Sequence, residues 1–354
     1  MTKYNKFFVT GGYGFIGSCL VRKLLNSKEN QVVNIDKMTY ASNELAVEDV
    51  HEGYKHYKKD INDIKFLNTA FNNYKPECVI HLAAESHVDR SIDSPGEFIN
   101  TNILGTYNLL NASYNYWLSL DKDEKENFRF IHVSTDEVYG DADTGLVFNE
   151  SSPYLPNSPY AASKASSDLL VRSWYKTFRF PVIITNSSNN YGKWQFPEKL
   201  IPLTIKKILL EEKIPIYGDG KQIRDWIHVE DHIDGLLMVL NKGNLGENYN
   251  ISTAIETTNI SLVEKICSIL NDIYPSENVN DYKKLISLVK DRPGHDLRYS
   301  VDNNKIVNEL NWSPKFNLKE GIVNTIKWYI DHKEWLLDDK KLTYDGRRLG
   351  TLKQ

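Results

Sequence analysis

Hydrophobic residues in the first half of the chain fall in short runs that alternate with longer amphipathic stretches. Runs suited to strands occupy residues 7–10, 31–35, 78–82, 130–134 and 181–186. Helical candidates lie between them, at residues 15–26, 62–74, 98–116 and 159–178. Alternation of this kind builds a parallel sheet with helices on its faces. The pattern therefore predicts an α/β fold with a doubly wound parallel sheet.

The second half of the chain has a less regular pattern. Helical stretches near residues 198–211, 260–274 and 318–331 are separated by short strands and loops. We expect a domain at residues 1–190 and a smaller C-terminal α/β substrate domain at residues 191–354. Residues 229–241 are a candidate segment for a return to the first domain. The polar run at residues 121–126 is interpreted as a solvated loop.

Composition and charge narrow the class of protein. The 354 residues are 41% hydrophobic and 25% charged, as in an ordinary soluble enzyme. A net charge of -4 gives no basic footprint for nucleic acid. The cysteines Cys19, Cys78 and Cys267 are scattered, which argues against a disulfide framework. Without a signal peptide or an apolar run of about 20 residues, we expect a cytoplasmic protein that does not enter a membrane.

A glycine-rich segment, residues 10–17 (TGGYGFIG), directly follows the first predicted strand and opens the first predicted helix. Glycines at this place permit a tight turn and a close approach of the backbone to a pyrophosphate, which the helix N-terminus then faces. Asp36 ends the second predicted strand, where a carboxylate binds ribose hydroxyls and repels a 2′-phosphate. Lys37 beside it weakens that preference a little. The segment predicts a Rossmann sheet that binds NAD.

Two further strand ends fit the same cofactor. Asp60 and Ile61 are expected to close a third strand, between the runs at 31–35 and 78–82, where an adenine would lie. Leu82, Ala83 and Ala84 follow the fourth predicted strand, and the small alanines allow the cofactor to approach the sheet edge. Each observation alone is weak.

Tyr160 and Lys164 are four residues apart on a predicted helix, so they share one face. A free tyrosine has a pKa of about 10, too high for a base at neutral pH. An adjacent ammonium lowers the pKa of a phenol. Ser134 or Thr135, at the end of the preceding strand, can hydrogen-bond the same substrate hydroxyl. Together these residues predict a hydride-transfer site.

Asp136 and Glu137 lie just past that strand, in the crevice where open α/β sheets bind ligands. Two neighbouring carboxyl groups can have their pKa values separated, which gives one acid and one base. The alternative is an acidic helix N-terminus that serves the helix dipole. Hydride transfer alone has no use for such a pair. The pair predicts an elimination framed by redox steps.

A metal site is not predicted. His228 and His232 are four residues apart, which suits two ligands on one helix face. However, the order HVEDH differs from the HExxH of zinc proteases, and residues 227–229 are interpreted as strand.

Over nearly its whole length the chain resembles the extended short-chain dehydrogenase/reductase family, and within it the dehydratases of dTDP-activated glucose. Besides the glycine-rich segment and the Tyr–Lys pair, the resemblance rests on residues 81–91 (HLAAESHVDRS), 134–140 (STDEVYG), 189–203 (NNYGKWQFPEKLIPL), 215–229 (PIYGDGKQIRDWIHV), 291–297 (DRPGHDL) and 344–350 (YDGRRLG). Related epimerases carry small neutral residues where Asp136 stands, and related dehydratases and decarboxylases usually carry Ser. The chain departs from the family pattern at Lys193 and Trp194, where Pro and Tyr are more usual.

The resemblance implies the residues of the site. The catalytic ones are Thr135, Asp136, Glu137, Tyr160 and Lys164. Those implied for the cofactor are Gly11, Gly14, Phe15, Ile16, Gly17, Asp36, Lys37, Thr39, Asp60, Ile61, Leu82, Ala83, Ala84, Thr101, Ser134, Tyr160, Lys164 and Asn189. Those implied for the substrate are Ser86, Thr135, Asn190, Lys199, Leu200, Pro215, Tyr217, Arg224, Asn259, Arg292 and His295. Among the last, Lys199 and Arg224 are cations suited to a diphosphate, Arg224 through a bidentate fork.

The implied reaction regenerates tightly bound NAD in each cycle. Tyr160 takes the C4 hydroxyl proton while NAD accepts the C4 hydride. The resulting ketone acidifies C5, from which Glu137 removes a proton as Asp136 protonates the departing C6 hydroxyl. The hydride then returns to C6 and C5 is reprotonated. Two alternatives stay open: another nucleotide-sugar dehydratase or epimerase of this fold, and a non-catalytic NAD-binding scaffold.

The resemblance also implies a homodimer. The helical candidates at 98–116 and 159–178 are similar to the two that pair across a twofold axis in this family. Residues spaced at three and four along one face of the first candidate give support, namely Tyr107, Leu110, Tyr114 and Trp117. A stripe of this kind is also typical of intrachain core.

Overall fold

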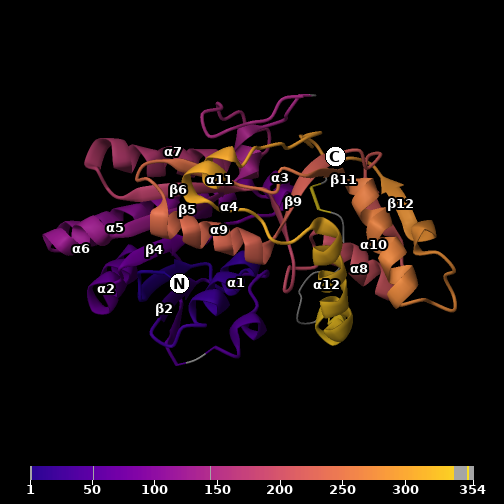
Figure 1. Ribbon diagram of the computed structural model, residues 1–354, viewed down its shortest axis with the longest axis horizontal. Helices are drawn as coiled ribbons and strands as arrows, with labels where there is room; N and C mark the ends of the chain where they lie inside the picture. Colours follow the sequence, from indigo (N-terminus) through magenta and orange to yellow (C-terminus); the bar gives the residue numbers. More distant parts are fainter. Residues whose placement is uncertain (1, 51, 144, 339–348, 351–354) are drawn as a thin grey trace.

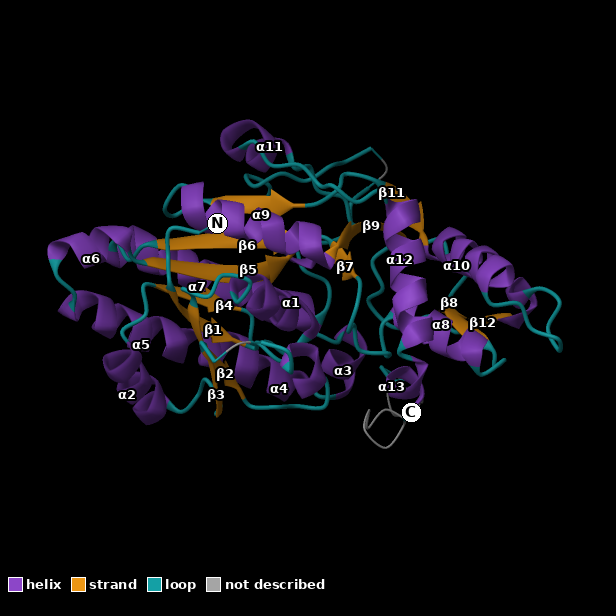
Figure 2. Ribbon diagram, turned by 60° about the horizontal axis from the view of Figure 1, so that its bottom comes forward, coloured by secondary structure: helices purple, strands orange, loops and turns teal. Residues whose placement is uncertain are grey.

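The computed structural model describes residues 2–50, 52–143, 145–338 and 349–350. Figures 1 and 2 show a large sheet wrapped by helices, with a smaller group of helices and short strands beside it. Of the motif at 344–350, only Leu349 and Gly350 are described; its other residues lie outside the described ranges. None of the described helices is long and apolar enough to cross a membrane.

Among the described residues the large sheet has seven parallel strands, in the order β10-β6-β5-β4-β1-β2-β3. Their bounds are Lys6–Thr10 (β1), Gln31–Asp36 (β2), Tyr54–Lys58 (β3), Cys78–His81 (β4), Arg129–Thr135 (β5), Val182–Ser187 (β6) and Asn248–Ile251 (β10). The strand order reverses between β1 and β4, and sheets of this kind open a ligand crevice at that point. The predicted doubly wound fold is confirmed.

Helices cover both faces of this sheet. On one face lie α1 (Phe15–Leu24), α9 (Val229–Lys242) and α11 (Asn304–Leu310), whose buried side chains form one core with β1. On the other face lie α2 (Ile64–Tyr74), α5 (Thr106–Ser119) and α7 (Pro159–Phe178). Cys19 and Cys78 are free and buried. The domain boundary at residue 190 stays a prediction.

The smaller group has its own apolar core, which includes Ile205, Leu262 and Ile326. Its helices are α8 (Leu200–Leu209), α10 (Asn259–Ile273), α12 (Leu318–Asp331) and α13 (Lys333–Leu337). Its strands are β8 (Ile214–Tyr217), paired with β12 (Ile286–Val289), and β9 (Ile223–His228), which lies between β7 (Asn189–Tyr191) and β11 (Glu256–Thr258). The short helical elements of the chain are η1 (Glu44–Val47), α3 (Val88–Asp93), α4 (Pro95–Phe98), η2 (Ile99–Gly105), α6 (Lys122–Asn127), η3 (Asp136–Tyr139) and η4 (Tyr282–Leu285).

Three local predictions differ from the structure in whole or in part. The polar run at 121–126 is not a loop, because Asp121 and Glu124 form a capping box that starts α6. The helix expected at 98–116 is instead α4, a π-helical stretch and α5 in succession. The strand expected to include Val229 ends at His228, whose side chain accepts from the Glu230 N–H and caps α9.

The stripe on α5 belongs mainly to the core of this chain. Leu110 is completely buried, and Tyr114 and Trp117 both pack edge-on against the buried ring of Phe180. Only Tyr107 in this stripe is well exposed. The stripe therefore does not support an intermolecular contact.

Candidate active site

The glycine-rich turn joins β1 to α1 where the strand order reverses. Gly11 has a φ of 74°, and a Cβ on it would lie 2.7 Å from the backbone nitrogen of Ala83. A Cβ on Gly17 would overlap the Gly11 carbonyl oxygen. Gly14 stands at the N-cap of α1 and has no side chain to cap it, so the first-turn N–H groups can meet an anion. Among the described residues, Asn189 on β7 has a buried Oδ1 without a hydrogen-bond partner.

Asp36 is fixed at the end of β2 and faces this turn. Its carboxylate accepts hydrogen bonds from the backbone N–H groups of Tyr13 at 3.0 Å and Met38 at 2.7 Å. Lys37 forms an ion pair with Glu85 at 3.2 Å and donates to Thr101 at 3.0 Å. Because Glu85 offsets the charge of Lys37, this lysine does little to attract a 2′-phosphate. The arrangement favours NAD.

The other residues implied for the cofactor are placed less uniformly. The backbone N–H groups of Leu82 and Ala83 donate to the carbonyl and hydroxyl of Thr10, so the end of β4 is tied to the end of β1. Asp60 does not close β3, which ends at Lys58, and its Oδ1 accepts from the Asn62 N–H. Ile61 is buried. Phe15 and Ile16 open α1, whereas Thr39 follows β2 and Ala84 follows β4.

Tyr160 and Lys164 lie at the start of α7, which Ser158 caps by accepting from the Ala161 N–H. The Lys164 ammonium donates to the Val133 carbonyl at 2.9 Å, and burial lowers its pKa to about 8. Burial raises the pKa of Tyr160 above its usual range, and the nearby Glu137 raises it further. In the chain by itself the Tyr160 pKa is therefore raised and not lowered as expected, because desolvation outweighs the effect expected of the Lys164 ammonium.

Beneath this pair lies a carboxylate that the sequence analysis did not single out. Asp168 accepts hydrogen bonds from Ser134 at 2.8 Å and Asn186 at 3.2 Å, and it lies 3.2 Å from His132 Nε2. Thr135 instead hydrogen-bonds the Tyr160 phenol. Of the two hydroxyls left open by the sequence, Thr135 is thus the one beside the base. The sequence contained one signal for Asp168, which is its position one helical turn after Lys164.

Asp136 and Glu137 form the start of η3 at the carboxyl end of β5. Burial raises the pKa of Asp136 well above its usual range, and the charges of Glu137 and Asp225 add to this. Burial also raises the pKa of Glu137, but the cations Arg292, Arg224 and Lys199 oppose it. Asp136 is thereby favoured as the acid and Glu137 as the base.

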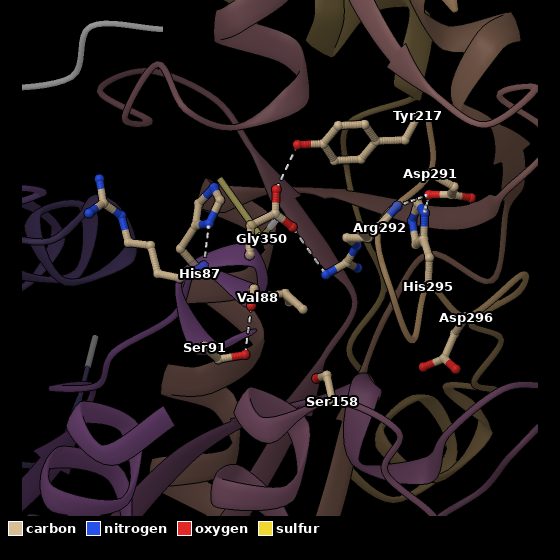
Figure 3. A network of polar contacts seen from close by, with 12 residues as sticks. His87, Val88, Ser91, Ser158, Tyr217, Asp291, Arg292, His295, Asp296 and Gly350 are labelled. Carbon is tan, nitrogen blue, oxygen red and sulfur yellow. Dashed lines mark hydrogen bonds and ion pairs between the residues drawn. The ribbon is translucent and has the colours of Figure 1, made fainter. Parts of the chain in front are cut away.

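Residues implied for the nucleotide gather around α3. Figure 3 shows Tyr217 and Arg292 reaching toward the helix that carries Val88 and Ser91. Both contact Asp89, whose Oδ2 accepts from the Tyr217 hydroxyl at 2.7 Å and whose Oδ1 lies 3.4 Å from Arg292 Nη1. His295 Nδ1 lies 2.6 Å from Asp291, and its ring meets that of Tyr217 edge-on. Asp89 was missed because only the fold brings its partners to it.

The remaining residues implied for the substrate line the same region. The ammonium of Lys199, at the start of α8 beside Leu200, donates to the Ser86 carbonyl at 3.0 Å. Pro215 lies on β8 with Tyr217. The Asn259 N–H donates to the Gln222 carbonyl at 2.9 Å.

Two implied contacts differ from expectation. Both terminal nitrogens of Arg224 donate to backbone carbonyls, those of Ile223, Leu297 and Asp296, so the expected free fork for a diphosphate is not present. The Asn190 side chain donates to the Ser188 carbonyl, and its Oδ1 lies 2.8 Å from His232 Nδ1. Both residues support the wall of the site. Within the described ranges, no group of three or more His, Cys, Asp or Glu could hold a metal ion.

The geometry has counterparts among known proteins. The family model described as GDP-mannose 4,6 dehydratase matches residues 8–325. A dTDP-glucose 4,6-dehydratase of Haemophilus influenzae is 51% identical over 327 residues, which cover 91% of this chain and 97% of the relative. The chain belongs to the dTDP-glucose 4,6-dehydratase family. Another member, from Neisseria meningitidis, is 50% identical over 98% of this chain and 99% of its own length.

A solved structure shows the same relationship. DesIV, a dTDP-glucose 4,6-dehydratase from Streptomyces venezuelae with NAD bound, superposes with a TM-score of 0.83 and 40% identity, over 93% of this chain and 98% of DesIV. The family consists of NAD-dependent hydro-lyases. Membership agrees with the elimination predicted from the Asp136–Glu137 pair and argues against the scaffold alternative.

Proposed function

We propose that this site converts dTDP-glucose to dTDP-4-keto-6-deoxyglucose and water. The observation that carries the proposal is the pair of adjacent carboxyl groups with unequal proton affinity, Asp136 and Glu137, beside the phenol of Tyr160. NAD fits the glycine-rich turn, the fixed carboxylate of Asp36 and the unpaired Oδ1 of Asn189.

The position of each side chain in the site suits one step of the reaction. Tyr160 takes the proton of the C4 hydroxyl, which Thr135 orients. NAD, when bound, supplies the hydride acceptor for C4 and the hydride donor for C6. Glu137 removes the C5 proton only after C4 is a ketone, since an unactivated C–H is too weak an acid for a carboxylate. Asp136, held protonated, gives its proton to the departing C6 hydroxyl.

The nucleotide is held at the other end of the site. Arg292 and Lys199 supply positive charge for the diphosphate, and both are close enough to lower the pKa of Glu137. Tyr217 and His295 form an aromatic wall next to them.

The test is product formation from defined nucleotide sugars. Purified protein without added cofactor should convert dTDP-glucose to a 4-keto-6-deoxy product, detected by its alkali-induced absorbance. UDP-glucose and GDP-mannose serve as competitors for specificity. Turnover that requires NADP, or that releases NADH with product, would contradict the proposal.

We further propose a cytoplasmic homodimer joined through α5 and α7. Well exposed apolar side chains on η2 and these two helices support it; they are Ile99, Leu104, Tyr107, Leu169 and Phe178. The three elements contact one another in the chain, so the side chains can contribute to a continuous surface. Apolar surface of this kind is typical of protein interfaces.

A further inference from the structure

After every turnover, the proposed reaction leaves two side chains in a protonation state that differs from the one in which the turnover began. Tyr160 gains the C4 hydroxyl proton, which the ketone product never takes back. Glu137 removes one proton from C5 and returns one. Asp136 loses its proton to the departing water, while the hydride that leaves C4 returns to C6. Tyr160 therefore carries one proton more than at the start of the turnover, and Asp136 carries one proton fewer.

The Thr135 hydroxyl contacts both of these groups. Its Oγ1 donates to Asp136 Oδ1 at 3.2 Å and also hydrogen-bonds the phenol of Tyr160. The Glu137 N–H donates to the same oxygen at 3.3 Å and helps to hold it in place. A hydroxyl donates one hydrogen and accepts two hydrogen bonds. Thr135 can therefore release its own proton to one neighbour while it receives a proton from the other.

The surroundings favour a route inside the protein. Tyr160, Thr135 and Asp136 are only 9%, 8% and 3% exposed, respectively. The neighbouring hydroxyl of Ser134 is already donating to Asp168. Among the described residues, Asp136 Oδ2 is buried without a partner, so Oδ1 is the oxygen that a protein donor reaches.

The surroundings of Asp136 favour the protonated state that the transfer restores. Burial, Glu137 and Asp225 all raise the pKa of Asp136, although burial and Glu137 also raise the pKa of Tyr160. Lys164, one helical turn from Tyr160, favours the phenolate that remains.

We propose that Thr135 is the proton shuttle that resets the site between turnovers. The Tyr160 O–H bond breaks and its proton goes to Thr135 Oγ1, while the proton of Thr135 goes to Asp136 Oδ1. The products are a phenolate and a carboxylic acid, the states in which the next turnover begins. No electrons move and no co-reactant is consumed. This inference rests on the proposed function.

The test compares the first turnover with later ones. Thr135→Val keeps the shape of the side chain and removes the hydroxyl, whereas Thr135→Ser keeps the hydroxyl. Each protein, loaded with NAD, is mixed with excess dTDP-glucose and product is counted by rapid quench. For Thr135→Val we expect a burst of about one product per site, followed by a steady rate slower by roughly 10²-fold, the usual scale of a lost proton-transfer group. The serine variant should retain the wild-type ratio of first to later turnovers.

A substrate-binding role alone gives a different result. If Thr135 only orients the C4 hydroxyl, the valine variant slows the first and later turnovers by the same factor, and the shuttle is wrong. Thr135→Ala is measured alongside in case valine disturbs η3, with bound NAD as the check on folding. Absence of a burst in both variants overturns the inference. Failure of the wild type to convert dTDP-glucose would instead overturn the proposed function.

Discussion

Lys164 is a buried cation whose charge depends on a carboxylate one turn further along α7. Asp168 raises the pKa of Lys164 against the larger effect of burial, and the opposing result is a pKa of about 8. Burial raises the pKa of Asp168 itself to about 6. Other titratable groups that interact with Asp168 are His132 on β5, Tyr139 on η3, Tyr154 in the segment before α7 and Tyr160 itself. The charge of Lys164, which lies beside Tyr160, therefore depends on the protonation state of Asp168.

We predict that Asp168→Asn moves the alkaline limb of activity to lower pH. As pH rises through the Lys164 pKa, Lys164 loses its proton. The positive charge that stabilises the Tyr160 phenolate is then absent, so kcat falls. Without Asp168 that pKa drops below about 8, and the fall begins earlier. The measurement is the pH profile of kcat, with Asp272→Asn on the exposed face of α10 as the control. An unchanged alkaline limb would contradict the role of Asp168.

At the residue scale, sequence spacing revealed which groups meet but not their electrostatics. The adjacency of Asp136 and Glu137 was enough to predict an acid–base pair. The sign of the Tyr160 shift was missed, because spacing cannot show that the Lys164 ammonium points to the Val133 carbonyl or how deeply the phenol is buried. The prediction for Arg224 failed for the same reason, since two of its carbonyl partners, Leu297 and Asp296, come from a distant loop.

At the scale of elements, α3 connects the cofactor side of the site with the nucleotide side. Its Asp89 holds Tyr217 from β8 and Arg292 from the loop after β12. Its Arg90 forms an ion pair with Glu198, and Glu198 also accepts from the Tyr40 hydroxyl beyond β2. A short helix thus fixes the spacing between two binding regions.

Asp89→Asn should weaken nucleotide binding while leaving the chemistry nearly intact. The change removes the negative charge that Tyr217 and Arg292 share, and a hydrogen bond to a charged group is worth about 1.5–3 kcal/mol. We expect KM for dTDP-glucose to rise roughly tenfold or more, with kcat little changed. Asp93→Asn on the same helix, where the carboxylate accepts from the Gly350 N–H, is the control. An equal loss in kcat would show that Asp89 acts on the reaction itself.

Regular elements with strong periodicity were predicted well, as β1, β5 and α7 show. The failures have local causes. The charges of residues 121–126 concealed the capping box of α6, and the edge strand β10 is only four residues long. Its pairing with β6 is parallel and depends on a long crossover connection, which no local pattern of this strand predicts.

At the scale of the whole molecule, the two groups of elements meet at α3, where Asp89 contacts Tyr217 and Arg292, and apolar surface remains on the face formed by α5 and α7. The stripe that sequence periodicity assigned to an interface is mainly core, whereas exposed residues such as Leu169 were not singled out. Periodicity cannot distinguish the two, because a helix packed on its own sheet and one packed on a partner show the same spacing.

We predict that Leu169→Glu separates the dimer. Leu169 is 58% exposed on α7, and a charge there opposes burial against a second copy. Light scattering at low micromolar concentration should give twice 40.9 kDa for the wild type and 40.9 kDa for the variant. Leu288→Glu, at a residue 59% exposed on β12, should stay dimeric. A wild-type mass of 40.9 kDa would contradict the proposed assembly.

The most direct test of the proposed chemistry is Glu137→Gln mixed with dTDP-glucose. Tyr160 and the cofactor residues are intact in this variant, but the base for C5 is missing. We expect C4 oxidation to proceed and elimination to stop, so that enzyme-bound NADH accumulates and solvent deuterium no longer enters C5. Glu126→Gln on the exposed helix α6 should behave as the wild type does. Normal turnover of Glu137→Gln, with deuterium at C5, would show that Glu137 is not the base of the elimination.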